Sequence, residues 1–180
     1  MTNWRPESAD MYRDVQTLYT YHHSNLKKSP EVRLRKMWRS SRDGARSPVQ
    51  WDGSPNAGFT TGTPWFYVNR NYPEINVEKQ NADPDSVLNF YRKAIALRKA
   101  LPVVKEGIYK EHFHNHSKQY IYSREMPGQK ILVVCAFSDR NQKMKLPRGF
   151  DLTKANCILC NYPDTHSPTL RPYETRVYQW

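Results

Sequence analysis

The chain has 180 residues, of which 38% are hydrophobic and 25% are charged. This length suits one ordinary domain, or a small domain with part of another, and excludes two complete large domains. Lysine and arginine number 28 against 17 aspartate and glutamate residues, so the formal net charge is +11. The longest apolar run, Ile131 to Phe137, is far shorter than the ~18 residues of a membrane span, so we expect a soluble protein without a membrane partner.

The positive charge invites a nucleic-acid interpretation. Basic residues cluster only between Lys27 and Arg46, however, and no segment carries an RNA-binding aromatic signature, a zinc-finger spacing or a basic zipper. We therefore expect a solvated cationic face and no nucleic-acid partner. Nothing near Met1 resembles a secretory leader, and three cysteines cannot all pair within one chain, so a cytoplasmic location is expected.

Two helical patterns occupy the first forty residues. Ser8 is the expected cap of the first helix, which should end near Asn25 and whose stripe is Tyr12, Val15, Leu18, Tyr19 and His22. Ser29 should cap the second helix, with Pro30 at its first position. Its apolar positions are Val32, Leu34, Met37 and Trp38, and its other face is cationic through Arg33, Arg35, Lys36 and Arg39.

Residues 43–80 carry most of the turn chemistry and show neither a helical nor a strand period, so a long loop is expected there. A structureless connection of this length is usually functional. A third helix is then predicted with Asp83 as its cap, Pro84 at its first position and Pro102 as its stop. Its stripe consists of Val87, Phe90, Tyr91, Ala94, Ile95, Leu97 and Leu101.

After Pro102 the apolar period changes from helical to two, which indicates strands. Residues 131–137 are apolar on both faces, as expected of a central strand that is covered on each side. Met126-Pro127-Gly128-Gln129 is a turn with Pro and Gly where a type II turn needs them. Residues 103–180 therefore predict an antiparallel sandwich, with strands at 108–114, 119–125, 131–137, 156–160, 169–170 and 175–180.

Neither of two groups of possible metal ligands is arranged as a metal site requires. Cys157 and Cys160 have the C-x-x-C form, but residues three apart on a strand point to opposite faces, so the two thiols cannot chelate one ion and we interpret them as core cysteines. His112, His114 and His116 alternate, but no acidic or sulfur ligand has an identifiable place beside them, so an exposed hairpin end is expected. The sequence thus predicts no metal and no cofactor.

Familiar catalytic motifs are missing from the sequence. We find no phosphate loop, nucleotide fingerprint, nucleophile elbow or H-E-x-x-H pattern. Carboxylates do occur in or near the long loop, but none is placed by pattern as a general acid or base. We interpret them as solvated turn residues: Asp43, Asp52, Glu74 and Glu78.

The long loop carries a specific resemblance. Residues 41–52 read S-R-D-G-A-R-S-P-V-Q-W-D and residues 56–59 read N-A-G-F. This resembles S-R-D-N-A-R-T-P-M-Q-W-D…N-A-G-F of the α-glucosidases in family 13 of the glycoside hydrolases, with Gly44, Ser47 and Val49 as departures. Oligo-1,6-glucosidases and trehalose-6-phosphate hydrolases are nearest in style. Further matches in the same order include residues 12–14, 71–72, 91–93, 95–99 and 170–174, so the resemblance covers essentially the whole chain.

The resemblance implies a fold in two parts. Residues 1–102 would be the C-terminal portion of a (β/α)8 catalytic barrel, namely its eighth loop with helices and its last outer helix. Residues 103–180 would be the C-terminal β-sandwich domain. The fold class is therefore α+β, with barrel helices and a long loop followed by an antiparallel sandwich.

The resemblance also implies where the chemistry lies. The family's nucleophile, acid/base residue and third carboxylate would belong to earlier barrel strands, so this chain would contain no catalytic residue and would be inactive alone. Arg46 resembles the loop arginine that reaches the non-reducing glucose in the innermost subsite. Trp51, Phe59 and Trp65 are sugar-platform candidates, although packing of the loop on the barrel is the simpler expectation.

The sequence thus predicts the C-terminal part of an exo-acting, retaining α-glucosidase that acts on short α-linked oligosaccharides, with α-1,6 links preferred. Its expected partners are the oligosaccharide and the missing barrel portion. The alternatives are a non-catalytic module that binds carbohydrate or acidic partners and, third, a basic nucleic-acid binder. A salt titration separates these classes, because phosphate-driven binding weakens steeply with salt.

Overall fold

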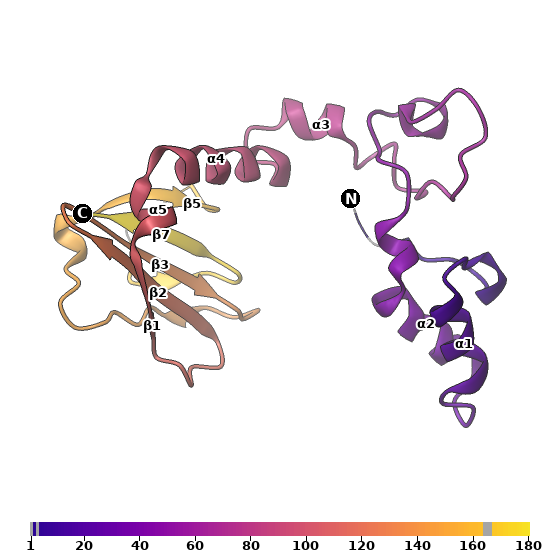
Figure 1. Cartoon of the computed structure of the whole chain (residues 1–180), viewed down its shortest axis with the longest axis horizontal. Coiled ribbons are helices and arrows are strands. Elements are labelled where there is room, and N and C mark those ends of the chain that lie inside the picture. Colours follow the sequence, from indigo (N-terminus) through magenta and orange to yellow (C-terminus); the bar gives the residue numbers. More distant parts are fainter. Residues whose placement is uncertain (1, 3, 164–166) are drawn as a thin grey trace. The chain divides into compact units, whose positions relative to one another are not determined.

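The computed structural model describes residues 2, 4–163 and 167–180. The chain divides into two compact units, Met1–Ser86 and Val87–Trp180, which are described separately (Figure 1). The boundary predicted at residue 102 separates a barrel portion from a sandwich domain. The division into compact units at Ser86 does not test that boundary, which stays a prediction.

The first unit is helical, and its described residues include no strand. Its elements are η1 (Ala9–Met11), α1 (Val15–His23), α2 (Pro30–Ser40), η2 (Arg42–Ala45), η3 (Pro55–Gly58) and α3 (Val77–Ala82). The core is a cluster of Trp4, Tyr12, Met37 and Phe66. The Trp4 ring lies 5.0 Å from that of Phe66 and 5.8 Å from that of Tyr12, edge to face in both pairs.

The first predicted helix begins later than expected. Ser8 makes no side-chain cap, and Tyr12 lies in extended backbone after the short η1 turn, buried against Trp4. Asp14 is the true cap of α1, because its carboxylate accepts a hydrogen bond from the Thr17 amide. The second helix, α2, has Pro30 at its start as predicted, although only Met37 of its apolar positions is buried.

The predicted loop after Asp43 is more structured than its sequence indicates, since it contains η3 and α3. The amides of Trp51 and Asp52 both donate to the Ala57 carbonyl, and Asn56 and Ala57 both have positive φ. The side-chain amide of Gln50, which is 1% exposed, donates to the Ile75 carbonyl. Backbone and amide contacts, rather than an apolar period, therefore hold this segment.

The second unit begins with α4 (Val87–Ala100), three residues after the predicted start. Asp83 does not cap this helix: it ends α3, and its carboxylate accepts from the Asp85 amide in the intervening turn. The helix ends before Pro102 as expected. A short helix that the sequence did not indicate, α5 (Pro102–Glu106), follows directly.

A five-stranded antiparallel sheet in the order β1-β2-β3-β7-β5 forms most of the second unit (Figure 1). A smaller sheet pairs β4 with β6. The strands are β1 (Ile108–His112), β2 (Gln119–Met126), β3 (Gln129–Ala136), β4 (Gln142–Lys143), β5 (Asn156–Cys160), β6 (Thr169–Leu170) and β7 (Thr175–Gln179). The short β4 was not predicted. The others match the predicted strands to within two residues.

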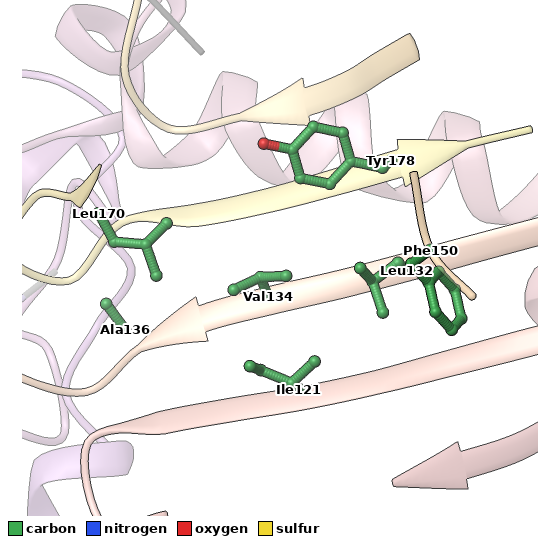
Figure 2. Close-up of a cluster of buried hydrophobic side chains, with 7 residues drawn as sticks. All are labelled: Ile121, Leu132, Val134, Ala136, Phe150, Leu170 and Tyr178. Carbon is green, nitrogen blue, oxygen red and sulfur yellow. The ribbon is translucent and has the colours of Figure 1, made fainter. Parts of the chain in front are cut away.

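The central strand β3 is covered on both faces, as predicted. One face joins a core in which Leu132 and Val134 meet Ile121, Leu170 and Tyr178, with Phe150 closing one end (Figure 2). On the other face Val103 of α5 packs on Ile131 and Val133. The predicted antiparallel sandwich is confirmed.

A buried ion pair ties β7 to the segment around β6. Glu174 and Arg176 are both 0% exposed, and the Arg176 Nε donates to Glu174 Oε1 over 2.7 Å. Arg171 adds its backbone amide and two guanidinium nitrogens to the same carboxylate. Arg176 also donates to the carbonyls of Ser167 and Thr169. Each buried charge is therefore hydrogen-bonded on several sides.

The expectation that Cys157 and Cys160 point to opposite faces is wrong. The register between β5 and β7 shifts by one residue between Cys157 and Leu159, so Cys157 pairs with Tyr178 while Cys160 pairs with Arg176. Because those two partners are two residues apart on β7, both cysteines lie on the same face of the sheet. The bulge at Ile158 is the physical reason.

Candidate functional site

The candidate site lies where two short segments of the first unit meet, residues 12–17 before and in α1, and residues 41–46 around η2. Asp43 connects them. Its side chain is fully buried, and its Oδ2 accepts the backbone amides of Arg13 at 2.8 Å and Asp14 at 2.9 Å. The interpretation of Asp43 as a solvated turn residue is therefore wrong, since a carboxylate with two amide donors locks one segment onto the other.

Asp14 is the second buried carboxylate of this site. Its Oδ2 accepts the Thr17 amide at 3.0 Å and the Thr17 hydroxyl at 2.7 Å, which caps α1. Its Oδ1 lies 2.8 Å from Nη2 of Arg42. Burial acts to raise the pKa of Asp14, but the hydrogen bonds from Thr17 and Arg42 outweigh it and hold that pKa below its usual range. Asp14 is therefore ionised at neutral pH.

Arg46 joins both carboxylates through a single nitrogen. Its Nη1 lies 3.1 Å from Asp43 Oδ1 and 3.6 Å from Asp14 Oδ1. The other guanidinium nitrogens, Nε and Nη2, have no hydrogen bond to the described residues, and the side chain is 41% exposed. The guanidinium is thus anchored through Nη1, and its Nε and Nη2 remain available to donate hydrogen bonds to a ligand.

A neutral phenol completes the buried surroundings. Tyr12 is 2% exposed, and its hydroxyl has no hydrogen-bond partner among the described residues. Burial, followed by the negative charge of Asp43, raises the pKa of Tyr12 to about 12. The Tyr12 phenol consequently stays protonated across the physiological pH range and adds no charge to the site.

A polar cavity of about 600 Å³ lies next to these carboxylates, between α1 and α2. Apart from Met37, its lining consists of charged, hydroxyl and amide side chains: Asp14, Gln16, Thr17, Thr20, Lys36, Ser40 and Arg42. The arrangement can hold and orient a polar ligand. It does not fit general-acid catalysis, because such an acid needs a raised pKa whereas that of Asp14 is lowered.

Of the residues that sequence reasoning singled out, the structure brings Arg46 into this cluster. Trp51, Phe59 and Trp65 are 51%, 41% and 66% exposed in the chain. Sequence reasoning missed Asp14 and Asp43. Both stand in segments that match the family pattern, Y-R-D and S-R-D, but only the fold shows that these two acidic positions pair with Arg42 and Arg46.

The three histidines do not come together. His112 bonds Ser123 at 3.0 Å and packs on the Phe150 ring, His114 lies near Glu111, and His116 accepts the Gln119 amide. Within the described residues, no group of three or more His, Cys, Asp or Glu side chains is arranged to hold a metal ion.

Comparison with known proteins places this geometry in a family. Residues 2–107 match the alpha-amylase family, described as "Alpha amylase, catalytic domain". That match spans more than half of the chain. The chain belongs to this family, glycoside hydrolase family 13. The resemblance carried by residues 41–59 is thereby confirmed.

Relatives within family 13 match almost all of the chain. It is 38% identical to the probable oligo-1,6-glucosidase 2 of Bacillus subtilis over 99% of its length, and 37% identical to the trehalose-6-phosphate hydrolase of the same organism over 99%. The chain spans about a third of the length of these relatives, 33% in both cases.

Solved structures of family 13 enzymes have the same fold over this span. The trehalose-6-phosphate hydrolase of Bacillus licheniformis superposes with a TM-score of 0.90 at 35% identity, covering 99% of this chain and 34% of that one. The isomaltulose synthase of Klebsiella sp. LX3 gives 0.86 at 30% identity, covering 99% and 33%. The predicted fold class is confirmed. In the described residues no helix is long and apolar enough to cross a membrane.

Proposed function

We propose that this chain is the C-terminal part of an exo-acting α-glucosidase that hydrolyses short α-linked gluco-oligosaccharides, α-1,6 links preferred, by a retaining mechanism. The observation that carries the proposal is the match of 99% of the chain to enzymes named oligo-1,6-glucosidase, at 36–38% identity. A cytoplasmic location stays a prediction.

The catalytic carboxylates belong, in this proposal, to a part of the enzyme upstream of the chain. Retaining hydrolysis needs a nucleophile and an acid/base carboxylate about 5 to 5.5 Å apart on either side of the scissile bond. Asp14 and Asp43 are close to each other, but both are buried and occupied by amide and guanidinium donors. They suit a structural task, which is to hold Arg46.

The missing barrel portion is the proposed partner of α4. This helix has no buried residue, although its apolar positions follow helical spacing. Val87, Tyr91 and Ile95 recur every four residues and are 70%, 64% and 49% exposed. A stripe of this kind needs an apolar surface to cover it. The neighbouring strands of a family 13 barrel would provide that surface.

Arg46 is proposed to bind the terminal glucose. Nη1 is held by Asp43 and Asp14, which anchors this corner of the guanidinium, while Nε and Nη2 keep hydrogens to donate. Two such parallel donors suit a sugar hydroxyl and an adjacent carboxylate. Holding the glucose in this way would align its anomeric carbon with the upstream nucleophile.

The proposal is tested in the intact enzyme, with the upstream sequence restored. Arg46→Ala should cost about 2 to 4 kcal/mol of transition-state binding, because it removes a charge-assisted hydrogen bond and leaves a partner unpaired. This corresponds to about 30- to 1000-fold in kcat/KM. Arg46→Lys should recover little, since an ammonium lacks the planar fork.

Arg70→Ala is the matched control. Arg70 pairs with the exposed Glu7 and is itself 81% exposed, so its loss should leave kcat/KM within a few fold. If Arg46 only braces the loop, its alanine variant will melt earlier while keeping near-normal kinetics. A folded Arg46→Ala enzyme with kcat/KM close to wild type would overturn the role in glucose binding.

The 180-residue chain by itself provides a second test. Without the upstream carboxylates it should not hydrolyse p-nitrophenyl α-glucoside or isomaltose above the buffer blank. Turnover that persists through repurification would show that the chain holds its own catalytic residues. The proposal that the catalytic carboxylates lie upstream would then be wrong.

A further inference from the structure

A strongly cationic cavity lies in the first unit, along α2 and the end of α1. It has a volume of about 590 Å³, within the range of small-molecule sites. Six of the described residues that line it are lysine or arginine, and none is aspartate or glutamate. The cations come from three segments: Arg5 before η1, Lys28 before α2, and Arg33, Arg35, Lys36 and Arg39 within α2.

The cations are accompanied by neutral donors and by fixed geometry. Ser24, Asn25 and Ser40 also line the cavity. Arg33 is held in place, because its Nη1 donates to the Tyr21 carbonyl at 2.7 Å and its guanidinium stacks 4.7 Å from the Tyr21 ring. Its buried Nε has no hydrogen-bond partner among the described residues. A buried donor without an acceptor is costly. A bound anion would supply that acceptor once the Arg33 side chain moves toward it.

Like charges gathered around a cavity repel one another, and a bound anion would relieve this repulsion. Guanidinium groups match a phosphate in both geometry and charge, and serine and asparagine side chains donate further hydrogen bonds. We propose that this cavity is a binding site for a small phosphate-bearing ligand. The site is distinct from the Arg46 cluster, because Asp14, Asp43 and Arg46 do not line this cavity, although Lys36 and Ser40 line both it and the polar cavity beside Asp14.

The experiment measures binding to the full 180-residue chain by calorimetry, with three probes: glucose 6-phosphate, glucose and inorganic phosphate. Glucose 6-phosphate should bind about tenfold or more tightly than glucose, because charge-assisted hydrogen bonds form only with the phosphate. Inorganic phosphate should compete with it, which assigns the affinity to the phosphate and not to the sugar. Equal binding of glucose and glucose 6-phosphate would overturn the proposal.

A charge-matched pair of variants locates the site. Arg39→Glu reverses an exposed charge in the last turn of α2 that lines this cavity and not the polar cavity beside Asp14, whereas Arg98→Glu reverses an exposed charge in the last turn of α4 in the second unit. The first should weaken glucose 6-phosphate binding about tenfold and the second less than about twofold, because Arg98 does not line the cavity and the charge of an exposed side chain outside a binding site is screened. Equal losses would mean that net charge alone attracts the anion, and the proposed site would be wrong.

Hydrogen exchange shows whether the first unit is folded when it binds. Glucose 6-phosphate should slow amide exchange in α1 and α2, and not in the sheet of the second unit. Exchange in α1 and α2 that does not change at saturating ligand would overturn the proposal. A short DNA duplex that binds more tightly, with a steep loss between 50 and 200 mM salt, would replace it by a nucleic-acid site.

Discussion

Glu174→Gln should be among the most damaging single changes in the second unit. The substitution keeps the size of the side chain but removes its charge. Arg176, which is 0% exposed, then loses the negative charge that it contacts at 2.7 Å and remains buried without a counter-charge. The partly buried Arg171 loses the same counter-charge.

The expected loss in the free energy of unfolding follows from the burial of the ion pair and from the pKa of Glu174, with similar magnitudes. Breaking a buried ion pair by removing one partner costs about 3 to 5 kcal/mol. Independently, burial opposes ionisation of Glu174, but the donors of Arg171 and Arg176 outweigh it and lower the pKa of Glu174 from 4.5 to about 2. At 1.36 kcal/mol per pKa unit this shift corresponds to about 3 kcal/mol. A loss of that size lowers the Tm of a unit this small by about 12 to 24 °C.

Thermal and urea unfolding of the chain, followed by near-ultraviolet circular dichroism, measures the loss. Glu125→Gln is the matched control, because Glu125 lies on β2 in the same unit but is 47% exposed. Its ion pair with Lys130 is long, at 3.8 Å. Its loss should stay within about 0.5 kcal/mol. If Glu174→Gln destabilises the unit no more than Glu125→Gln does, the energetic role assigned to the buried pair is refuted.

The same carboxylate sets a pH dependence. Because the pKa of Glu174 is lower in the folded state than the usual 4.5, its stabilisation is fully present above about pH 4.5. It is lost as the pH falls through the folded-state pKa of about 2. The wild-type chain should therefore lose stability steeply between these two values, and Glu174→Gln should show a shallower slope over the same window.

Two further predictions concern the two units. Amides of β2 and β3 should exchange slowest, whereas those of residues 2–86 should exchange faster, because the first unit has a smaller apolar core; uniformly slow exchange along a monomeric chain would contradict this. Gly58→Ala should destabilise the first unit by about 1 to 3 kcal/mol, because Gly58 has a φ of +64° and a Cβ would come within 2.5 Å of Asp52 Oδ2. Gly53→Ala, with nothing within 4 Å of the added Cβ, is its control, and equal melting of the two variants would argue against strain at Gly58.

Strands were easier to predict than helix starts in this chain. Period-two alternation predicts β2, the continuous apolar run at residues 131–137 predicts β3, and the Pro127-Gly128 turn joins them. Each of these signals is local, and Gly128 adopts the positive φ that the turn requires. The starts of α1 and α4 could not be read from the nearest capping residue. Asp14 and Ser8 are both good caps by type, and tertiary contacts of Tyr12 with Trp4 decide between them.

The candidate site was predictable only in part for a related reason. Arg46 stands inside a recognisable segment, so the resemblance located it. Its two anchors could not be deduced from pattern, because Asp43 meets the amides of Arg13 and Asp14 from about thirty residues away. A buried aspartate in a turn has the same local sequence as a solvated one, and only the fold distinguishes them.

The bulge in β5 changes how this strand tolerates changes of length. Ile158 is the residue without a partner on β7, between Cys157 opposite Tyr178 and Leu159 opposite Val177. Deleting any paired residue of a strand turns every later side chain over to the other face. Deleting Ile158 would instead leave both neighbouring pairs in register. This makes Ile158 the position at which β5 can be shortened by one residue while the final strand β7 keeps its place in the sheet.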